Sequence, residues 1–171
     1  AGSLDIERVA FSVSDLLDEV AGLIRPFVRR KPDLQLVIER PNLPLLTGDA
    51  GKLRQILLNL VGNAVKFTDR GVIQLATERR DEGVDRGMFR FTVADTGVGI
   101  PEDKLEDIFR PFTQSDNTVA RRYGGTGLGL AICQRIAGHL GGTVGVRSEP
   151  GVGSTFFVDL PFDIEIGPAS L

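Results

Sequence analysis

The stretch NLVGNAVKFT, residues 59–68, places two amides and an ammonium within an apolar helical run. Asn59, Asn63 and Lys66 recur at i, i+4 and i+7, so they share one face of the predicted helix. Asparagine carbonyl oxygens can join a Mg²⁺ shell completed by phosphate and water, and the lysine can meet the same phosphates. A solvated polar face explains the stretch equally well. Against that, asparagine is a poor helix former and this face carries no acid.

A second candidate is DTGVGI, residues 95–100, where a carboxylate and two glycines follow a strand-like run. Asp95 could accept a hydrogen bond from an amino group such as the exocyclic amine of adenine, and bare backbone at Gly97 and Gly99 would let a base come close. Taken alone, the segment is explained better by a simple turn. It is not the dinucleotide fingerprint, because no third glycine opens a helix at the required position.

The segment YGGTGLGLAI carries four glycines that lead into a predicted helix. Gly127 and Gly129 fall at or inside its first turn, where each costs about 1 kcal/mol relative to alanine. A close-packed helix start could explain this cost. Exposed amides at a helix N-terminus explain it better, because they bind anions. The preceding polar segment is typical of a lid over phosphates, and it carries three arginines: Arg110, Arg121 and Arg122.

The elements that must position these residues follow from periodicity and turn residues. In chain order we expect a strand over 9–13, a helix from Ser14 that Pro32 ends, a strand over 34–39, a turn-rich segment ending in the N-cap Asp49, a helix over 50–67, strands over 71–80 and 88–95, a short helix from Pro101, a polar loop, a helix over 128–140 and two strands between 142 and 162. This order predicts an α+β fold. The expected fold is a two-layer α/β sandwich, a mixed, mostly antiparallel sheet of about five strands with three main helices on one face.

Length and composition suit one globular domain, since the chain has 171 residues, 42% of them hydrophobic and 25% charged. We expect residues 13–162 to form that domain. Residues 1–12 would be the end of a linker and a first strand, and residues 163–171 a C-terminal tail or linker. A net charge of −3 gives no reason to expect a nucleic-acid partner, and no apolar run reaches the length of a membrane span. The single cysteine, Cys133, excludes an internal disulfide and fits a reducing cytoplasm.

Taken together, these segments resemble the catalytic and ATP-binding domain of bacterial sensor histidine kinases, the Bergerat fold that DNA gyrase, MutL and a heat-shock chaperone share. NLVGNAVKFT matches the asparagine box, DTGVGI the first glycine box, FRPF the phenylalanine box, GGTGLGLAI the second glycine box and GVGSTFFVDLP the closing strand pair. All five occur in family order. The sequence around residues 48–68 is also typical of hybrid kinases, which carry a receiver domain.

The resemblance implies a role for each matching residue. Asn59 and Asn63 would bind Mg²⁺, Lys66 a phosphate and Asp95 the adenine amine. Arg110 would contact the γ-phosphate or a neighbouring domain. Thr155 resembles the hydroxyl that reaches Asp95 and the base through water. The remaining residues implied to contact ATP are Phe67, Gly97, Gly99, Ile100, Phe109, Gly125, Thr126, Gly127, Leu128 and Gly129.

The sequence departs from the superfamily's ATP hydrolases at one residue that bears on catalysis. The superfamily's ATP hydrolases place a glutamate four residues before the metal-binding asparagine, and here that residue is Gln55, which cannot act as a base at neutral pH. We therefore expect slow hydrolysis and phosphate transfer to another acceptor. The family's acceptor is a histidine on an upstream helical hairpin. The chain's single histidine, His139, is expected to be structural.

The resemblance further implies partners and location. It implies a dimerisation and histidine-phosphotransfer domain of the same parent protein, and a receiver domain or response regulator. We expect a monomeric fragment of a homodimeric parent, located in the cytoplasm, with no nucleic-acid partner and no membrane insertion of the fragment itself. Two alternatives remain open, a nucleotide-sensing scaffold of a pseudokinase and an anti-sigma-type serine kinase that uses the same pocket.

Overall fold

The computed structural model describes residues 5–109 and 129–165; residues 1–4, 110–128 and 166–171 lie outside this description. Its elements are β1 (Val9–Phe11), α1 (Val13–Val28), β2 (Leu34–Ile38), β3 (Leu46–Gly48), α2 (Ala50–Phe67), β4 (Gly71–Arg79), β5 (Arg86–Asp95), the 3₁₀ turns η1 (Glu102–Lys104) and η2 (Asp107–Phe109), α4 (Gly129–His139), β6 (Thr143–Glu149) and β7 (Gly153–Ile164). Within the described residues, no helix is both long and apolar enough to cross a bilayer.

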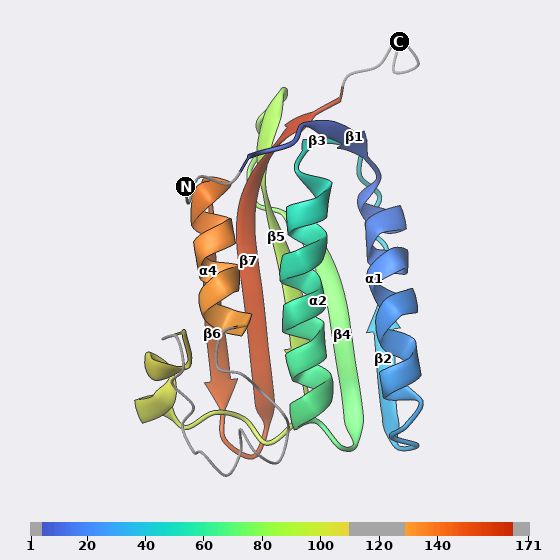
Figure 1. Cartoon of the computed structure of the whole chain (residues 1–171), viewed down its shortest axis with the longest axis vertical. Helices are drawn as coiled ribbons and strands as arrows, with labels where there is room; N and C mark the ends of the chain where they lie inside the picture. Colours follow the sequence, from blue (N-terminus) through green and yellow to red (C-terminus); the bar gives the residue numbers. More distant parts are fainter. Residues whose placement is uncertain (1–4, 110–128, 166–171) are drawn as a thin grey trace.

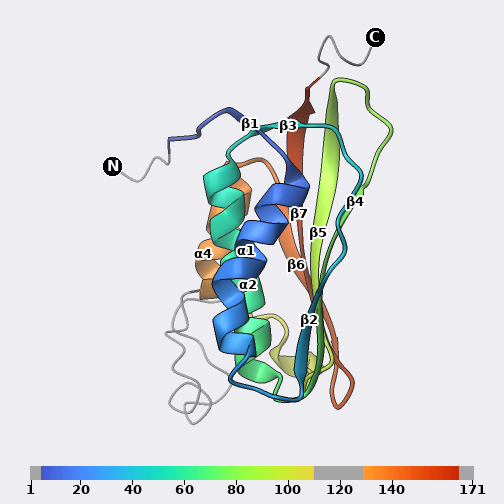
Figure 2. The ribbon, with the colours of Figure 1, turned by 90° about the vertical axis from the view of Figure 1, so that its right-hand side faces the viewer.

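The described residues form two layers, a sheet and a layer of three α-helices that lie side by side on one of its faces (Figures 1 and 2). The sheet order is β1-β3-β7-β5-β4-β2, and β6 pairs with β7. Only β2 and β4 are parallel; the other pairs are antiparallel. The predicted fold class, a two-layer sandwich with a mixed and mostly antiparallel sheet, is therefore confirmed.

The central helix, α2, begins and ends where the sequence predicts. Asp49 caps its N-terminus, because the Asp49 carboxylate accepts from the Lys52 amide at 3.0 Å. Leu53, Ile56 and Leu57 lead a stripe of wholly or almost wholly buried side chains that faces the sheet. The same periodicity leaves the stripe of Asn59 to Lys66 partly exposed on a neighbouring face.

Helix α1 begins one residue earlier than the predicted start at Ser14, because Ser12 is the cap and accepts from the Asp15 amide. It ends at Val28, well before Pro32, and it contains Pro26. The apolar face of α1 is only partly buried. Leu23 and Phe27 are about half exposed (52% and 51%), while the core contains Leu16, Leu17, Val20 and Ile24.

Three further expectations need correction. The sheet has seven strands where about five were expected; the segment predicted as turn contains β3, whose backbone pairs with both β1 and β7. The helix expected from Pro101 is a pair of short 3₁₀ turns. Strand β7 continues to Ile164, past the expected boundary at 162, because Asp163 and Ile164 pair with β3.

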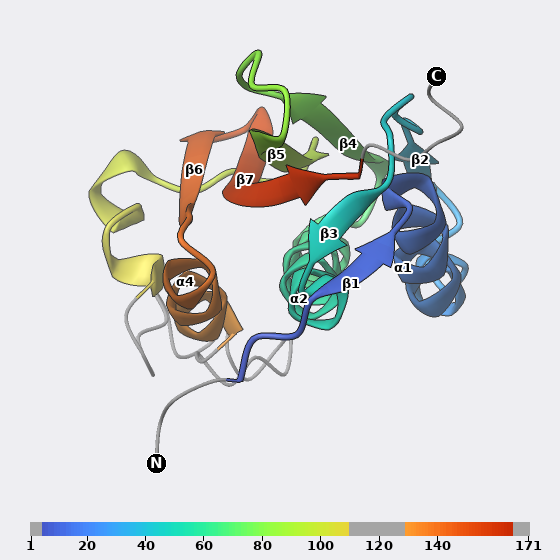
Figure 3. The same ribbon diagram turned by 90° about the horizontal axis from the view of Figure 1, so that it is seen from above.

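The two ends of the sandwich are built from different segments. At one end, β1 and β3 cross above the start of α2 (Figure 3). At the other end lie the C-terminus of α2, the end of β5, the start of α4 and the turn between β6 and β7 (Figure 1). The end of the asparagine stripe, Asp95 and the glycines that follow it therefore lie at the second end, far from β1.

Candidate nucleotide-binding site

The asparagine stripe of α2 faces the first turns of α4. A Cβ built on Gly129 would lie 3.9 Å from Asn63 Nδ2. One turn further along α4, the Cys133 thiol donates to the Ile56 carbonyl of α2 at 3.8 Å. Asn59, Asn63 and Lys66 are each partly exposed. The stripe therefore borders α4 while its polar atoms keep access to solvent.

Cys133 also contacts the Asn59 side chain. Burial raises the pKa of the Cys133 thiol to about 11, and a hydrogen bond from Asn59 opposes this rise. Asn59 Oδ1 is the atom of this side chain that suits a hard cation.

Lys66 and Phe67 form the end of the stripe. No described acidic residue forms an ion pair with the Lys66 ammonium, although eight ion pairs occur elsewhere in the described chain. The next side chain, Phe67, is 37% exposed. A free cation beside an accessible ring is the combination expected for phosphate and base contacts.

Asp95 ends β5 in a partly buried position on the helix-facing side of the sheet. Its Oδ1 accepts from the amides of Gly97 at 2.9 Å and Ser154 at 3.3 Å. Burial raises the pKa of Asp95 above its ordinary value, and these two hydrogen bonds oppose the rise. Because both amides bind Oδ1, Oδ2 is the oxygen left to accept from a ligand.

The residue after α2, Thr68, connects the stripe to Asp95. Thr68 is fully buried, and its Oγ1 makes no hydrogen bond of normal geometry to any described residue, although it lies close enough to help lower the pKa of Asp95. A Cβ on Gly97 would lie 2.7 Å from Thr68 Oγ1 and 2.8 Å from the Phe67 carbonyl oxygen. The end of α2 and the loop after β5 are therefore in direct contact, and only glycine fits between them.

The rest of the first glycine box is tied to the β6–β7 hairpin. The Ile100 amide donates to Ser148 Oγ at 2.6 Å, and Ser148 Oγ lies 2.8 Å from Ser154 Oγ. Gly99 has a φ of +76°, and a Cβ there would lie 2.3 Å from the Glu149 carbonyl oxygen. The loop is thus fixed from both sides, by α2 at Gly97 and by the hairpin at Gly99.

Thr155 does not face Asp95, contrary to the prediction. In the β5–β7 register Asp95 pairs with Ser154, and Thr155 pairs with Ala94. Because side chains alternate along a strand, Thr155 lies on the sheet face opposite the helices. The hydroxyl on the correct face is that of Ser154, which is 6% exposed. The sequence holds both hydroxyls side by side, so only the register distinguishes them.

Of the other residues predicted to contact the nucleotide, some are placed by the structure and some lie outside its description. The Phe109 ring packs edge-on against Phe156 with centroids 6.4 Å apart, so its described contact is with the core. Gly129 opens α4 as expected. The remaining predicted contacts lie outside the described residues: Arg110, Gly125, Thr126, Gly127 and Leu128.

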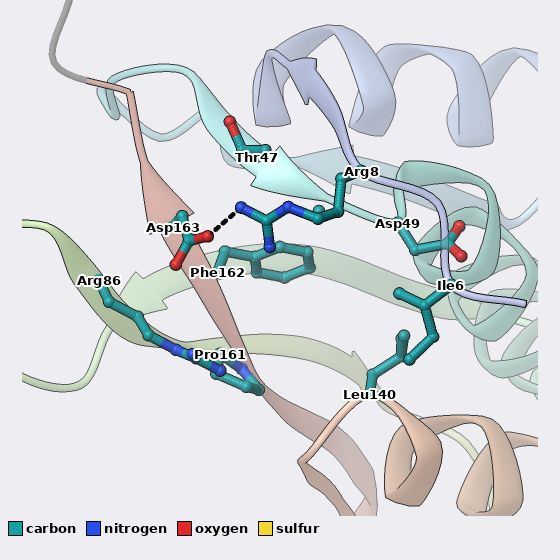
Figure 4. A pocket seen from close by; sticks show the side chains of 10 residues that line it. Ile6, Arg8, Thr47, Asp49, Arg86, Leu140, Pro161, Phe162 and Asp163 are labelled. Atoms are coloured by element: carbon teal, nitrogen blue, oxygen red, sulfur yellow. Dashed lines mark hydrogen bonds and ion pairs between the residues drawn. The ribbon is translucent and has the colours of Figure 1, made fainter.

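A cavity of about 190 Å³ lies at the opposite end of the domain (Figure 4). It is lined by Arg86 and Leu140 among others, and Arg8 and Asp163 form an ion pair at its edge. Arg86 begins β5 and Asp95 ends it, which separates the cavity from Asp95 by the length of a ten-residue strand. The cavity is therefore not the predicted nucleotide site.

The fold and this constellation define an ATPase domain of the type found in histidine kinases. Residues 48–164 match the family described as "Histidine kinase-, DNA gyrase B-, and HSP90-like ATPase". The chain belongs to this family, and the resemblance drawn from its motifs is confirmed.

Curated relatives are sensor kinases. The chain is 45% identical over 166 residues to the sensor histidine kinase AruS of Pseudomonas aeruginosa, covering 96% of this chain and 16% of AruS. It is 38% identical over 165 residues to the signal transduction histidine-protein kinase BarA of Escherichia coli, covering 96% of this chain and 18% of BarA. The chain thus spans less than a fifth of the length of either relative.

Solved structures of histidine kinases contain a domain with a similar fold. Full-length ShkA in complex with AMPPNP superposes with a TM-score of 0.83 at 38% identity, covering 98% of this chain and 34% of ShkA. The histidine kinase ThkA in complex with the response regulator TrrA gives a TM-score of 0.69 at 27% identity, covering 91% of this chain and 42% of ThkA. The fold of this chain is therefore shared with domains of these two histidine kinases.

Proposed function

We propose that this domain binds Mg·ATP and, joined to a helical dimerisation domain, donates the γ-phosphate to a histidine there. The observation that carries the proposal is the contact of the asparagine stripe with the Asp95 loop through Thr68 and Gly97. This contact supports the proposal because it joins the residues assigned to the phosphates with those assigned to the base. AMPPNP in the related ShkA supports a nucleotide as the occupant.

The residues present suit both parts of the ligand. Asp95 would accept from the exocyclic amine of adenine. The Thr68 hydroxyl, which has no hydrogen bond of normal geometry within the described part of the chain, could bond a base nitrogen or a bridging water. Asn59 and Asn63 offer amide oxygens one turn apart, which suits Mg²⁺ because this ion keeps several water and phosphate ligands. Bound Mg²⁺ would neutralise charge that develops on the phosphates during transfer.

Within this chain, catalysis would consist of positioning and charge neutralisation. Lys66 would bind a phosphate, and Arg110 remains a prediction for the γ-phosphate. Gln55, exposed one turn before Asn59, has no basic group to activate water, which favours transfer over hydrolysis. His139 is exposed at the far end of α4, next to the remote cavity, so the acceptor would be a histidine of another domain.

The partners follow from the same proposal. The complex of the related ThkA with a response regulator supports a receiver domain or response regulator as the final phosphate acceptor. Reconstitution with the parent's dimerisation segment tests the reaction: acid-labile phosphate on that segment is the expected product. Acid-stable phosphoserine on a partner would indicate a serine kinase. The absence of any phosphate transfer would favour a nucleotide-sensing scaffold.

Replacing Asn59 with alanine tests the metal-binding side. We expect wild-type affinity for a non-hydrolysable ATP analogue, measured by isothermal titration calorimetry, to rise when Mg²⁺ is added. We expect the Asn59→Ala variant to lose most of that rise, because the variant lacks one amide oxygen for the cation. Gln55→Ala, one turn away and exposed, is the matched control and should keep the rise. Unchanged metal dependence in Asn59→Ala would contradict the ligand role.

A further inference from the structure

The C-terminus of α2 has no cap of its own. The last carbonyls of a helix need partners from outside the helix, which a glycine in the left-handed conformation often helps to supply. Here the residue after the helix is Thr68, in an extended conformation with φ −122° and ψ 111°. The carbonyls at this end therefore depend on a group from another element.

Lys31 supplies that group from the turn after α1. Its ammonium lies 2.5 Å from the Val65 carbonyl oxygen, 3.1 Å from that of Thr68 and 3.4 Å from that of Lys66. It also forms an ion pair with Asp69 at 3.2 Å. An ammonium has three donors, and these four acceptors use all of them. A cation at this end is also favoured by the helix dipole.

Lys31 is itself held in place. Its amide donates to the Val28 carbonyl at 2.9 Å, and its own carbonyl accepts from the Leu34 amide at 3.1 Å. Its side chain is 25% exposed. The ammonium therefore extends from a hydrogen-bonded turn between α1 and β2 and is mostly buried.

The carbonyls that Lys31 binds surround the residues assigned to the nucleotide. They are the carbonyls of Val65, Lys66 and Thr68, and the intervening Phe67 carbonyl lies against Gly97 of the Asp95 loop. Of these four consecutive carbonyls, three thus bind Lys31 and one contacts the loop. A change in the direction of this turn would move Lys66 relative to Asp95.

We propose that Lys31 is a positioning residue of the nucleotide site: its ammonium sets the direction of the last turn of α2, and hence the spacing between the phosphate-binding Lys66 and the base-binding Asp95 loop. The proposal rests on the nucleotide-binding function inferred above. Lys31 does not touch the ligand and acts through the carbonyls of Val65, Lys66 and Thr68.

The test compares Lys31→Met with a matched control at the other end of the same helix. Lys52 is also partly buried, and its ammonium binds the Asp49 carboxylate at 2.8 Å and the Asp5 carbonyl at 2.5 Å. Both variants should lower the melting temperature of the 171-residue chain. Only Lys31→Met should weaken the ATP analogue, by about tenfold or more given the loss of charge-assisted hydrogen bonds. Equal affinities in the two variants would overturn the proposal.

Restoring the ammonium separates positioning from general stability. In Lys31→Cys, alkylation with 2-bromoethylamine creates a side chain of nearly the same length that ends in an ammonium. Cys133 should not react, because it is fully buried and its pKa is raised to about 11. We expect the weak binding of Lys31→Cys to return to near the wild-type value. A failure of rescue after complete alkylation, shown by mass spectrometry, would count against the role of the charge.

A nucleotide-free readout keeps the proposal distinct from the proposed function. In ¹H–¹⁵N spectra, Lys31→Met should shift the Gly97 amide, which donates to Asp95, while Lys52→Met should not. If the wild-type chain binds no nucleotide but Gly97 shifts as expected, the proposed function fails and the positioning role stands. An unshifted Gly97 amide in Lys31→Met refutes the positioning role in either case.

Discussion

Replacing Asp95 with asparagine should weaken ATP binding by about 10- to 100-fold, the range expected for one hydrogen bond to a charged acceptor in a partly buried site. Tripolyphosphate, which lacks the base, should bind both proteins almost equally in calorimetric titrations. The fold should survive, since Asn Oδ1 can still accept from the Gly97 and Ser154 amides. An equal loss of affinity for both ligands would contradict the assignment of Asp95 to the base.

The raised pKa of Asp95 gives this prediction a dependence on pH. The carboxylate is the acceptor, so base binding should decline as the pH falls through that pKa, earlier than for an ordinary aspartate. The Asn variant should lack this component, while the titration of ATP itself affects both proteins alike. For stability the sign is opposite: a raised pKa favours folding at low pH, and this contribution is lost as the pH rises through it. Asp95→Asn should therefore melt no lower than wild type at neutral pH.

Replacing Gly97 with alanine should disrupt the contact between the end of α2 and the Asp95 loop, at the centre of the site. The added Cβ would lie 2.8 Å from the Phe67 carbonyl oxygen and 2.7 Å from Thr68 Oγ1, and the first of these is backbone that cannot rotate away. Either α2 or the Asp95 loop must move, which overpacks the contact at a cost of about 1–3 kcal/mol. We expect a lower melting temperature and at least tenfold weaker binding of the ATP analogue.

Gly22→Ala is the matched control for this substitution. Gly22 lies on α1, and a Cβ built there has no atom within 4 Å. Alanine in a helix interior should stabilise the chain by up to about 1 kcal/mol and leave nucleotide affinity unchanged. If Gly97→Ala behaves like Gly22→Ala in both measurements, the contact between α2 and the loop does not shape the site.

The sequence was sufficient for the elements with strong local signals. Helix α2 has a cap at Asp49 and a regular apolar period, and both of its ends were predicted. Strand β3 was missed because its three residues lie in a segment rich in proline, and its pairing partners in β1 and β7 are far away in the sequence. Helix α1 continues past Pro26, so tertiary packing overrides the local preference there.

The site residues were predicted from sequence motifs. The wrong and missed assignments depend on strand register and on long-range contacts, which motifs do not show. Thr155 was chosen over Ser154 because adjacent hydroxyls can be separated only by the register of β7 against β5. Ser148 and Lys31 were missed because each acts across a long interval in the sequence, on Ile100 and on the end of α2. A lone serine in a strand and a lysine in a basic run carry no local signal for such roles.

β1 and the end of β7 lie at the end of the domain opposite Asp95, so a rotation at the β1 end displaces the region around Asp95. Both strands are joined through β3 at one end, and Asp95 lies at the other end of a ten-residue strand, about 30 Å away at the usual rise per residue. A rotation of about 20° at the β1 end would sweep a bound nucleotide through about 10 Å, as follows from that length. Small changes of angle at this end would therefore be enough to carry the phosphates into or out of reach of an acceptor.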